Sequence, residues 1–239
     1  MEQGSLVTED GLVLPPDPAE TLLRPLYEID DRMNVRLSMI QATDRGAVGL
    51  DGTSRSLNGP EDLRILKVTR SWADVVIVGA HTARVEDYTD IRIGQELTAV
   101  REETAPYYLS PPHLAIVTRN GRVPSGLDPS RTWIFTTEWG RAASIEGPLS
   151  DRTFIVGKDT IDMGRLMGLL WTAGHRRMLC EGGPALARMW LASGLVSDFC
   201  LTTSPRPSGR GPKVPAMPPR FHLLHTLTGG GYTMERWEY

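Results

Sequence analysis

The sequence predicts an α/β fold, with a mostly parallel central sheet, flanking helices and an antiparallel hairpin at the C-terminus. Three observations carry this prediction. Short apolar runs without alternation, such as residues 74–79, are typical of strands buried on both faces of a sheet. Helical segments alternate with these runs, as they do in parallel α/β sheets. The glycines at 229–231 separate the last two extended segments, as in a hairpin.

The chain is expected to begin with an N-terminal arm, residues 1–32. This stretch is acidic and contains four prolines, so we expect at most one short helix, around residues 19–23. The folded domain then spans residues 33–239. Its first strand starts at Asn34, because apolar residues alternate from there. A turn-rich stretch with four glycines, residues 43–59, follows.

A helix is predicted to begin at Pro60 and to continue to about Trp72. Asn58 or Gly59 precedes it as the N-cap, and proline suits the first helical position. The acidic residues at 61 and 62 favour the positive end of the helix dipole. The residues at 63, 66 and 70 share one face of this helix.

The remaining elements follow from the same patterns. Further strands are expected at residues 74–79, 113–118, 131–136, 153–156, 176–180 and 198–203. One helix is expected at residues 163–173, capped by Asp162 and stopped by Gly174, and another ends at Gly194. The proline-rich residues 205–219 form a loop, and residues 95–112 are the predicted flexible internal loop.

Composition restricts the functional classes. The chain has 239 residues and a net charge of −3, which gives no global reason to expect a nucleic-acid partner. It has two cysteines, too few for a disulfide framework, so a reducing compartment is favoured. The N-terminus lacks the features of a signal peptide, and no apolar run reaches the roughly 20 residues that span a bilayer. We therefore expect a soluble, cytoplasmic protein without a membrane partner.

The most specific local motif is Glu181-Gly182-Gly183-Pro184, between a predicted strand and a predicted helix. Two glycines let a ligand approach the backbone closely, and the free amides at a helix N-terminus attract phosphate. One interpretation is a cradle for the pyrophosphate of a nucleotide cofactor. The alternative is an ordinary strand-to-helix turn, because the motif does not match the usual dinucleotide fingerprint.

A second junction, residues 78–82, also follows a buried strand. Its amides and the Thr82 hydroxyl are candidates for holding a ribose or a phosphate, and a plain glycine turn is the alternative. Three basic residues, Arg70, Arg92 and Arg119, flank the two junctions at strand or helix ends, where ligands gather in α/β sheets. The five histidines show no metal-ligand spacing, and no nucleophile elbow is present, so we expect no metal site.

Read together, several segments resemble the pyrimidine reductases of riboflavin biosynthesis, the reductase half of the bifunctional deaminase–reductase, and most of all its stand-alone actinobacterial branch. The resemblance covers roughly residues 33–239 in the family's order and spacing. The matching segments are residues 51–54, 69–82, 86–88, 113–122, 181–184 and 194–198. It implies a dihydrofolate-reductase-like fold, NADPH as cofactor, a homodimer and reduction of 5-amino-6-(5-phosphoribosylamino)uracil. The deaminase half has no counterpart in the sequence, so a separate deaminase is implied.

The resemblance also implies roles for individual residues. The residues expected to contact NADPH are Gln41, Ser56, Gly79, Thr82, Glu86, Arg119, Gly182, Gly183, Pro184, Ala185 and Leu186. Arg119 stands near the expected adenosine phosphate, where a cation selects NADPH over NADH. The residues expected to contact substrate are Ser54, Arg70, Arg92 and Glu181. Asp44 is the family-matched acid for proton delivery, with turn capping as the alternative role.

The sequence departs from the family pattern at three places. Ser38 replaces a common lysine in the first strand, Arg45 interrupts the family's Ser-Leu-Asp-Gly run, and His81 stands where glycine is usual. These changes leave two alternatives open beside the pyrimidine reductase. One is reduction of a pterin such as dihydrofolate, and the other is a non-catalytic module that binds NADPH.

Overall fold

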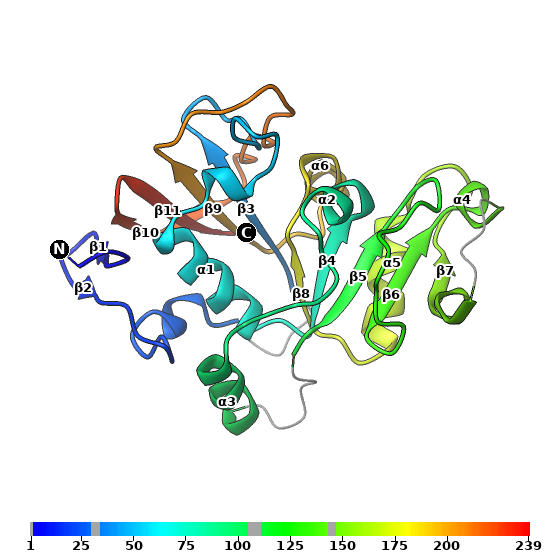
Figure 1. The fold of residues 1–239 in the computed structure, drawn as a ribbon, viewed down its shortest axis with the longest axis horizontal. Helices are drawn as coiled ribbons and strands as arrows, with labels where there is room; N and C mark the ends of the chain where they lie inside the picture. The colour runs from blue at the N-terminus through cyan, green and yellow to red at the C-terminus, as the bar shows by residue number, and fades with distance from the viewer. Residues whose placement is uncertain (1, 30–33, 105–110, 143–146) are drawn as a thin grey trace.

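Within the residues that the computed structural model describes (2–29, 34–104, 111–142 and 147–239), the strands form one 11-stranded sheet. Its strand order is β2-β1-β10-β11-β9-β3-β8-β4-β5-β6-β7 (Figure 1). The strands are β1 (Leu6–Thr8), β2 (Val13–Leu14), β3 (Asn34–Ala42), β4 (Val75–Gly79), β5 (His113–Val117), β6 (Thr132–Thr136), β7 (Thr153–Ile155), β8 (Arg177–Cys180), β9 (Asp198–Ser204), β10 (His222–Gly229) and β11 (Tyr232–Glu238).

The helices connect and cover these strands. They are α1 (Pro60–Ser71), α2 (Ala80–Val85), α3 (Gln95–Thr104), α4 (Glu138–Ala142), α5 (Met163–Thr172) and α6 (Pro184–Ser193), with 3₁₀ turns η1 (Arg24–Tyr27), η2 (Arg55–Leu57) and η3 (Gly147–Arg152). Gly59 is the N-cap of α1, and the Asp162 side chain caps α5 by accepting from the Arg165 amide at 2.9 Å. α6 ends at Gly194, which has the left-handed φ of 74° that a C-cap glycine supplies.

The sheet is parallel from β9 to β7 and antiparallel from β9 to β2. Strand β3 pairs in parallel with β8 and β9, and β4 pairs in parallel with β8 and β5. The C-terminal hairpin β10–β11 is antiparallel and joins the sheet through β9. The predicted fold class is therefore confirmed: a single mixed α/β domain with a mostly parallel sheet and an antiparallel C-terminal hairpin.

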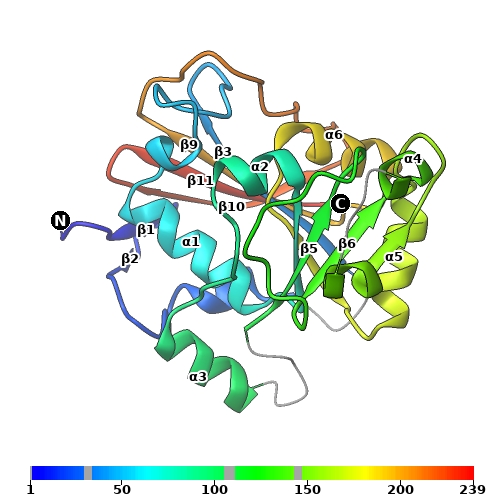
Figure 2. The ribbon, with the colours of Figure 1, turned by 45° about the vertical axis from the view of Figure 1, so that its right-hand side comes forward.

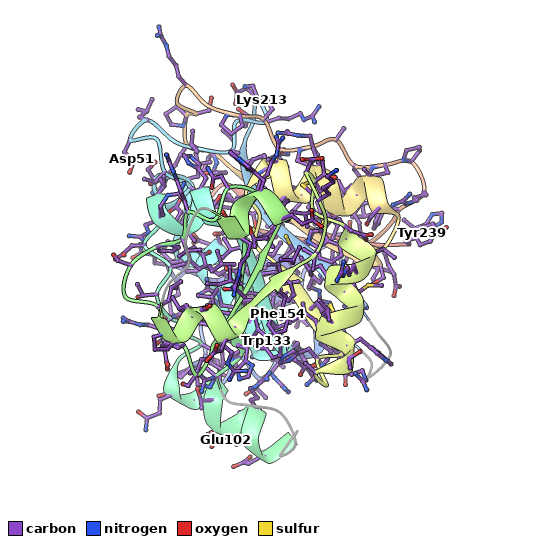
Figure 3. All side chains as sticks on the ribbon, turned by 90° about the vertical axis from the view of Figure 1, so that its right-hand side faces the viewer. Asp51, Glu102, Trp133, Phe154, Lys213 and Tyr239 are labelled. Atoms are coloured by element: carbon purple, nitrogen blue, oxygen red, sulfur yellow. The ribbon has the colours of Figure 1, made fainter. Side chains whose placement is uncertain are left out.

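Both faces of the sheet are covered, which is why its strands read as continuous apolar runs. Val75 and Ile77 of β4 pack into a core with α5 and α6, whereas Val76 and Val78 pack into a second core with α2. A third core lies under α1 and contains Ile65 and Val68. Figures 1 and 2 show α1 with the N-terminal strands at one end of the sheet and α5 beside β6 at the other. At that second end Trp133 stacks on Phe154 (Figure 3).

The N-terminal segment contains more structure than the sequence predicts. The residues around 19–23 form turns rather than a helix, η1 follows, and β1 pairs with β10 of the C-terminal hairpin. Arg64 of α1 anchors this segment by a two-pronged ion pair with Glu20 and by bonds to the Gly4 and Leu14 carbonyls. The predicted boundary between residues 32 and 33 lies outside the described residues.

A second difference concerns residues 95–112, which were expected to form a flexible loop. The structure has helix α3 over Gln95–Thr104, so this expectation is wrong for that part of the segment. Leu97 is buried, and the Arg101 guanidinium donates to the Ser71 carbonyl at the end of α1. Packing against α1 therefore holds a helix whose charged sequence lacks a strong apolar stripe. Helix α2, which directly follows β4, was not predicted either.

No helix in the described part of the chain is both long and apolar enough to cross a membrane.

Candidate active site

A cavity of about 710 Å³ lies at the carboxyl ends of β4 and β8 and beside α1. In Figure 1, α2 and α6 lie next to each other above these strand ends. Such an edge is the usual ligand position in an open α/β sheet. The walls are formed by residues 38–40 of β3, the face of α1 from 62 to 70, residues 81–92 around α2, the turn at 181–184, and two loops at 47–58 and 210–212.

The two loops pair with each other to make one wall. Isolated antiparallel bridges join Gly46 to Lys213 and Gly49 to Ser208. The Ala47 amide also donates to the Pro212 carbonyl at 3.0 Å. The turn-rich residues 43–59 and the proline-rich residues 205–219, which the sequence presents as separate loops, therefore act as one structural unit over the cavity.

An ion pair between Arg70 and Glu181 crosses the floor of the cavity. Arg70 Nε donates to Glu181 Oε1 at 2.6 Å, and Arg70 Nη2 donates to Oε2 at 2.7 Å. The Tyr88 hydroxyl donates to the same Oε2 at 2.7 Å. Burial raises the pKa of Tyr88 well above its ordinary value, and the nearby Glu181 charge raises it further, so the hydroxyl stays protonated. Burial opposes the charge of Arg70, but Glu181 outweighs it and raises the pKa of this guanidinium.

The glycine turn after β8 gives the cavity a wall of bare backbone. Gly182 accepts from the Gly79 amide at 2.8 Å, so the turns after β4 and β8 are joined. A side chain at Gly183 would have no room, because its Cβ would lie 2.5 Å from Thr82 Oγ1. Gly183 is the N-cap of α6, and no side chain caps this end of the helix. The turn thus fits a bound phosphate of a nicotinamide cofactor, with Thr82 and the amides of residues 185 and 186 as candidate ligands.

Glu86 couples the end of α2 to the loop wall. Its Oε1 accepts from the Ser54 amide at 2.6 Å, and its Oε2 lies 3.3 Å from Arg55 Nε. The Glu86 side chain is buried, whereas Arg55 is mostly exposed. The carboxylate therefore holds the loop at 51–55 against the cavity, and this contact gives Glu86 a positioning role that no sequence pattern indicated.

The cavity brings together eight of the residues predicted to bind ligands. From the predicted substrate group these are Ser54, Arg70, Arg92 and Glu181, and from the predicted cofactor group they are Thr82, Glu86, Gly183 and Pro184. Ser38 and His81, two of the departures from the family pattern, also line the cavity.

The other predicted residues lie behind or beside its walls. Gly182 and Ala185 are next to lining residues in the chain, and Gly79 and Leu186 are each two positions from one. Gln41 donates to the Thr203 hydroxyl at 3.2 Å, and the Ser56 hydroxyl donates to Asp51 at 2.6 Å. Arg119 is exposed at the end of β5, and its Nε donates to the Asp159 carbonyl at 3.0 Å.

Asp44, the predicted acid, does not line the cavity. Its carboxylate pairs with Lys213 at 2.6 Å and accepts from the Ser208 hydroxyl at 2.8 Å and the Gly46 amide at 3.0 Å. The hydrogen bond from Lys213, with those from Gly46 and Ser208, lowers the pKa of this carboxyl. These contacts favour the alternative role, turn capping, because the group holds no proton to deliver at neutral pH.

Several charged or hydroxyl-bearing lining residues had no predicted ligand role. Arg55 and Arg210 belong to the loop wall, Tyr88 follows α2, and Asp62 lies in the first turn of α1. The spacing of Asp62, Leu66 and Arg70 places all three on one face of α1, a periodicity that the sequence already contains. Asp62 was interpreted only as a helix-dipole residue, although it is buried against the cavity.

Among the described residues, no group of three or more histidines, cysteines or acidic residues is arranged to hold a metal ion. Both cysteines are buried and free, and burial raises the pKa of each thiol to about 12.

The fold and the cavity define a protein that binds a small molecule and a cofactor at the carboxyl edge of a parallel sheet. The chain belongs to the family of the RibD C-terminal domain, whose model matches residues 34–228.

Solved structures show the same fold. A pyrimidine reductase-like protein from Corynebacterium diphtheriae is 19% identical, with a TM-score of 0.72 over 86% of this chain and 91% of that chain. RibD from Acinetobacter baumannii is 18% identical, with a TM-score of 0.64 over 87% of this chain and 58% of that longer chain. A riboflavin biosynthesis reductase from Saccharomyces cerevisiae is 15% identical, with a TM-score of 0.60 over 88% of this chain and 91% of that chain. No curated protein sequence matches the chain.

The resemblance inferred from the motifs is thereby confirmed at the level of the family. The protein is an oxidoreductase of the pyrimidine reductase family of riboflavin biosynthesis, a family that uses a nicotinamide cofactor. No finding favours the pterin reductase alternative.

Proposed function

We propose that this protein is an NADPH-dependent 5-amino-6-(5-phosphoribosylamino)uracil reductase. One observation carries the proposal: a single cavity joins the predicted substrate residues on α1 and β8 to the predicted cofactor residues on α2 and α6. Membership of the RibD C-terminal domain family supports the reaction class. A cytoplasmic location and a homodimer stay predictions of the resemblance.

NADPH is proposed to bind along the joined turns after β4 and β8. The N-terminus of α6 has no side-chain cap, and the missing Cβ of Gly183 lets the Thr82 hydroxyl lie against this turn as a ligand for phosphate. Arg119 is exposed at the carboxyl end of β5, the strand next to β4, so its guanidinium is available to an adenosine phosphate. This cation is the proposed reason for preferring NADPH over NADH.

The substrate is proposed to occupy the part of the cavity between α1 and the loop wall. Arg70 and Tyr88 fix the orientation of the Glu181 side chain, whose acceptor oxygens suit the N–H groups of an aminouracil ring. Arg92 keeps 87% of its side chain exposed and lies 3.9 Å from Asp90, so it is free to turn toward a phosphate. The Ser54 hydroxyl is a further donor on the opposite wall.

When bound, the cofactor supplies a hydride to the electrophilic anomeric carbon of the opened ribose. The protein has to hold the reacting groups in contact and exclude water. Leu63, Leu66 and Val85 give the cavity apolar walls that serve this purpose.

The test is NADPH oxidation by purified protein with the phosphorylated aminouracil, with dihydrofolate as the competing substrate. The proposal predicts turnover with the aminouracil and none with dihydrofolate. Turnover with dihydrofolate alone would establish pterin reduction instead. Binding of NADPH without turnover of either compound would indicate a non-catalytic module.

A further inference from the structure

Asp62 and Glu181 are two of the five acidic residues that line the cavity, and their partners differ. Glu181 is held by the Arg70 guanidinium and the Tyr88 hydroxyl, so its carboxyl group has a cationic partner. Asp62 forms no ion pair with any cation of the described part of the chain, although only 8% of it is exposed. A buried carboxyl in a ligand cavity that lacks a cationic partner is a candidate for moving a proton.

The position of Asp62 is set by α1. It is the third residue after the N-cap Gly59, and it lies two helical turns from Arg70 on the same face, with Leu66 between them. Its neighbours are neutral: the Asn58 amide, oriented to donate, lies 3.2 Å from Asp62 Oδ2, and Thr202 of β9 forms a hydrogen bond with the carboxyl. The charge that acts on this carboxyl is that of Glu181, which directly follows β8 and pairs with Arg70.

These surroundings make Asp62 easier to protonate than an ordinary aspartate. Burial raises the pKa of the carboxyl to about 6, the hydrogen bond from Thr202 opposes this, and the negative charge of Glu181 adds to it. The residues of β3 that line the cavity, at positions 38–40, carry no charge. Water exclusion by a bound ligand strengthens the same preference.

Three other acidic groups in or near the cavity already have partners. Asp44 lies outside the cavity in an ion pair with Lys213. Tyr88 already donates its proton to Glu181, and Glu86 is occupied by the Ser54 amide and Arg55.

We propose that Asp62 is the proton donor of the reduction, a role that rests on the proposed function. The opened substrate has a C=N bond between the anomeric carbon and the exocyclic nitrogen. As the carbon gains a hydride, the electron pair of the C=N bond moves to the nitrogen, and the nitrogen takes the proton from the Asp62 carboxyl. The product is the ribitylamine, and the Asp62 carboxylate regains its proton from solvent.

The test compares wild type with Asp62→Asn, with Glu102→Gln as the matched control. Glu102 is exposed on α3, far from the loops that carry Asp51 and Lys213 (Figure 3). Steady-state kcat and KM are measured across the pH range of 5 to 8, which brackets the usual range of a raised carboxyl pKa. Infrared difference spectra of wild type against Asp62→Asn then titrate the protonated carboxyl directly, without turnover.

Asp62→Asn is expected to lower kcat about 100-fold or more with little change in KM. The wild-type kcat is expected to fall as the pH rises above about 6. The kcat of the variant is expected not to show this decrease. The infrared band of a protonated carboxyl is expected to disappear in the variant. Glu102→Gln is expected to match wild type.

The outcomes separate the two proposals. If wild type turns over and Asp62→Asn keeps kcat within about threefold, well below the loss of a general acid, Asp62 is not the donor and the reductase assignment stands. If wild type does not turn over the aminouracil, the proposed function fails and the role of Asp62 fails with it. Should Asp62→Asn not fold, a wild-type kcat that stays flat over the same pH range overturns the proposal.

Discussion

Arg70 and Glu181 meet in a two-pronged ion pair, with Nε to Oε1 at 2.6 Å and Nη2 to Oε2 at 2.7 Å. One residue comes from the last turn of α1 and the other from the end of β8, 111 positions later. Both side chains are largely buried, at 13% and 3% exposed. The pair therefore fixes the distance between the helix and the sheet on either side of the cavity.

Removing Arg70 is expected to affect both stability and catalysis. Arg70→Met leaves the Glu181 carboxylate buried with only the Tyr88 hydroxyl as partner, so the free energy of unfolding should fall by about 3 kcal/mol. Urea unfolding measures this loss. Arg92→Met, a change on a side chain 87% exposed, is the control and should alter stability by less than about 0.5 kcal/mol. Equal effects of the two variants would show that the pair is not structural.

The glycine at 183 is expected to be essential for cofactor binding. In Gly183→Ala the new Cβ would lie 2.5 Å from Thr82 Oγ1, so the hydroxyl must move out of the proposed phosphate site. NADPH affinity, measured by thermal shift or calorimetry, should fall about tenfold or more, which corresponds to about 1.4 kcal/mol. Gly168→Ala is the matched control, because a Cβ there meets nothing within 4 Å. Unchanged NADPH affinity in Gly183→Ala would remove this turn from the cofactor site.

The N-terminal segment is expected to stabilise the whole domain. Arg64→Ala leaves Glu20 buried without its partner and removes the donors to the Gly4 and Leu14 carbonyls. The free energy of unfolding should fall by about 3 kcal/mol, and limited proteolysis should cut within the first 29 residues sooner. The exposed Arg84→Ala serves as the control. A segment that is cut equally fast in wild type and variant would not be held by Arg64.

Asp62 should make the protein less stable as the pH rises, whereas most carboxyl groups in folded proteins have the opposite effect. Its pKa is raised to about 6 in the folded protein from 3.8, mainly by burial, so the folded state binds the proton more tightly. Asp62 therefore lowers the free energy of unfolding as the pH rises from about 4 through about 6. Asp62→Asn should be more stable than wild type by about 2 kcal/mol at neutral pH and nearly equal at about pH 4. A variant that is less stable at neutral pH would contradict this environment.

Much of the fold was predictable because its strongest signals are local. Buried strands such as β4 and β5 are uninterrupted apolar runs in the sequence. The N-caps of α1, α5 and α6 are Gly59, Asp162 and Gly183, residue types that are common at helix starts. The missed elements depend on distant partners. β1 is two to three residues of strand held by β10, more than 200 positions away, and α3 is held by contacts with α1.

The glycine turns and Arg70 could be predicted as parts of the site, because these positions need particular residue types. The contacts between side chains within the site could not be predicted. Nothing local indicates that Glu181 would compensate Arg70 or that Glu86 would accept from Ser54. Asp62 was misread because an acid in the first turn of a helix already has a sufficient explanation in the helix dipole. Its spacing of four residues to Leu66 and eight to Arg70 is the signal that could have shown it facing the cavity.

The central claim is that this cavity performs a hydride transfer from NADPH to a phosphorylated aminouracil. The most direct measurement uses NADPH that carries deuterium at the transferable position, followed by mass spectrometry of the product. Hydride transfer from NADPH is expected to give a ribitylamino product with one deuterium on the former anomeric carbon. A product without deuterium, or no product at high enzyme concentration, would contradict it.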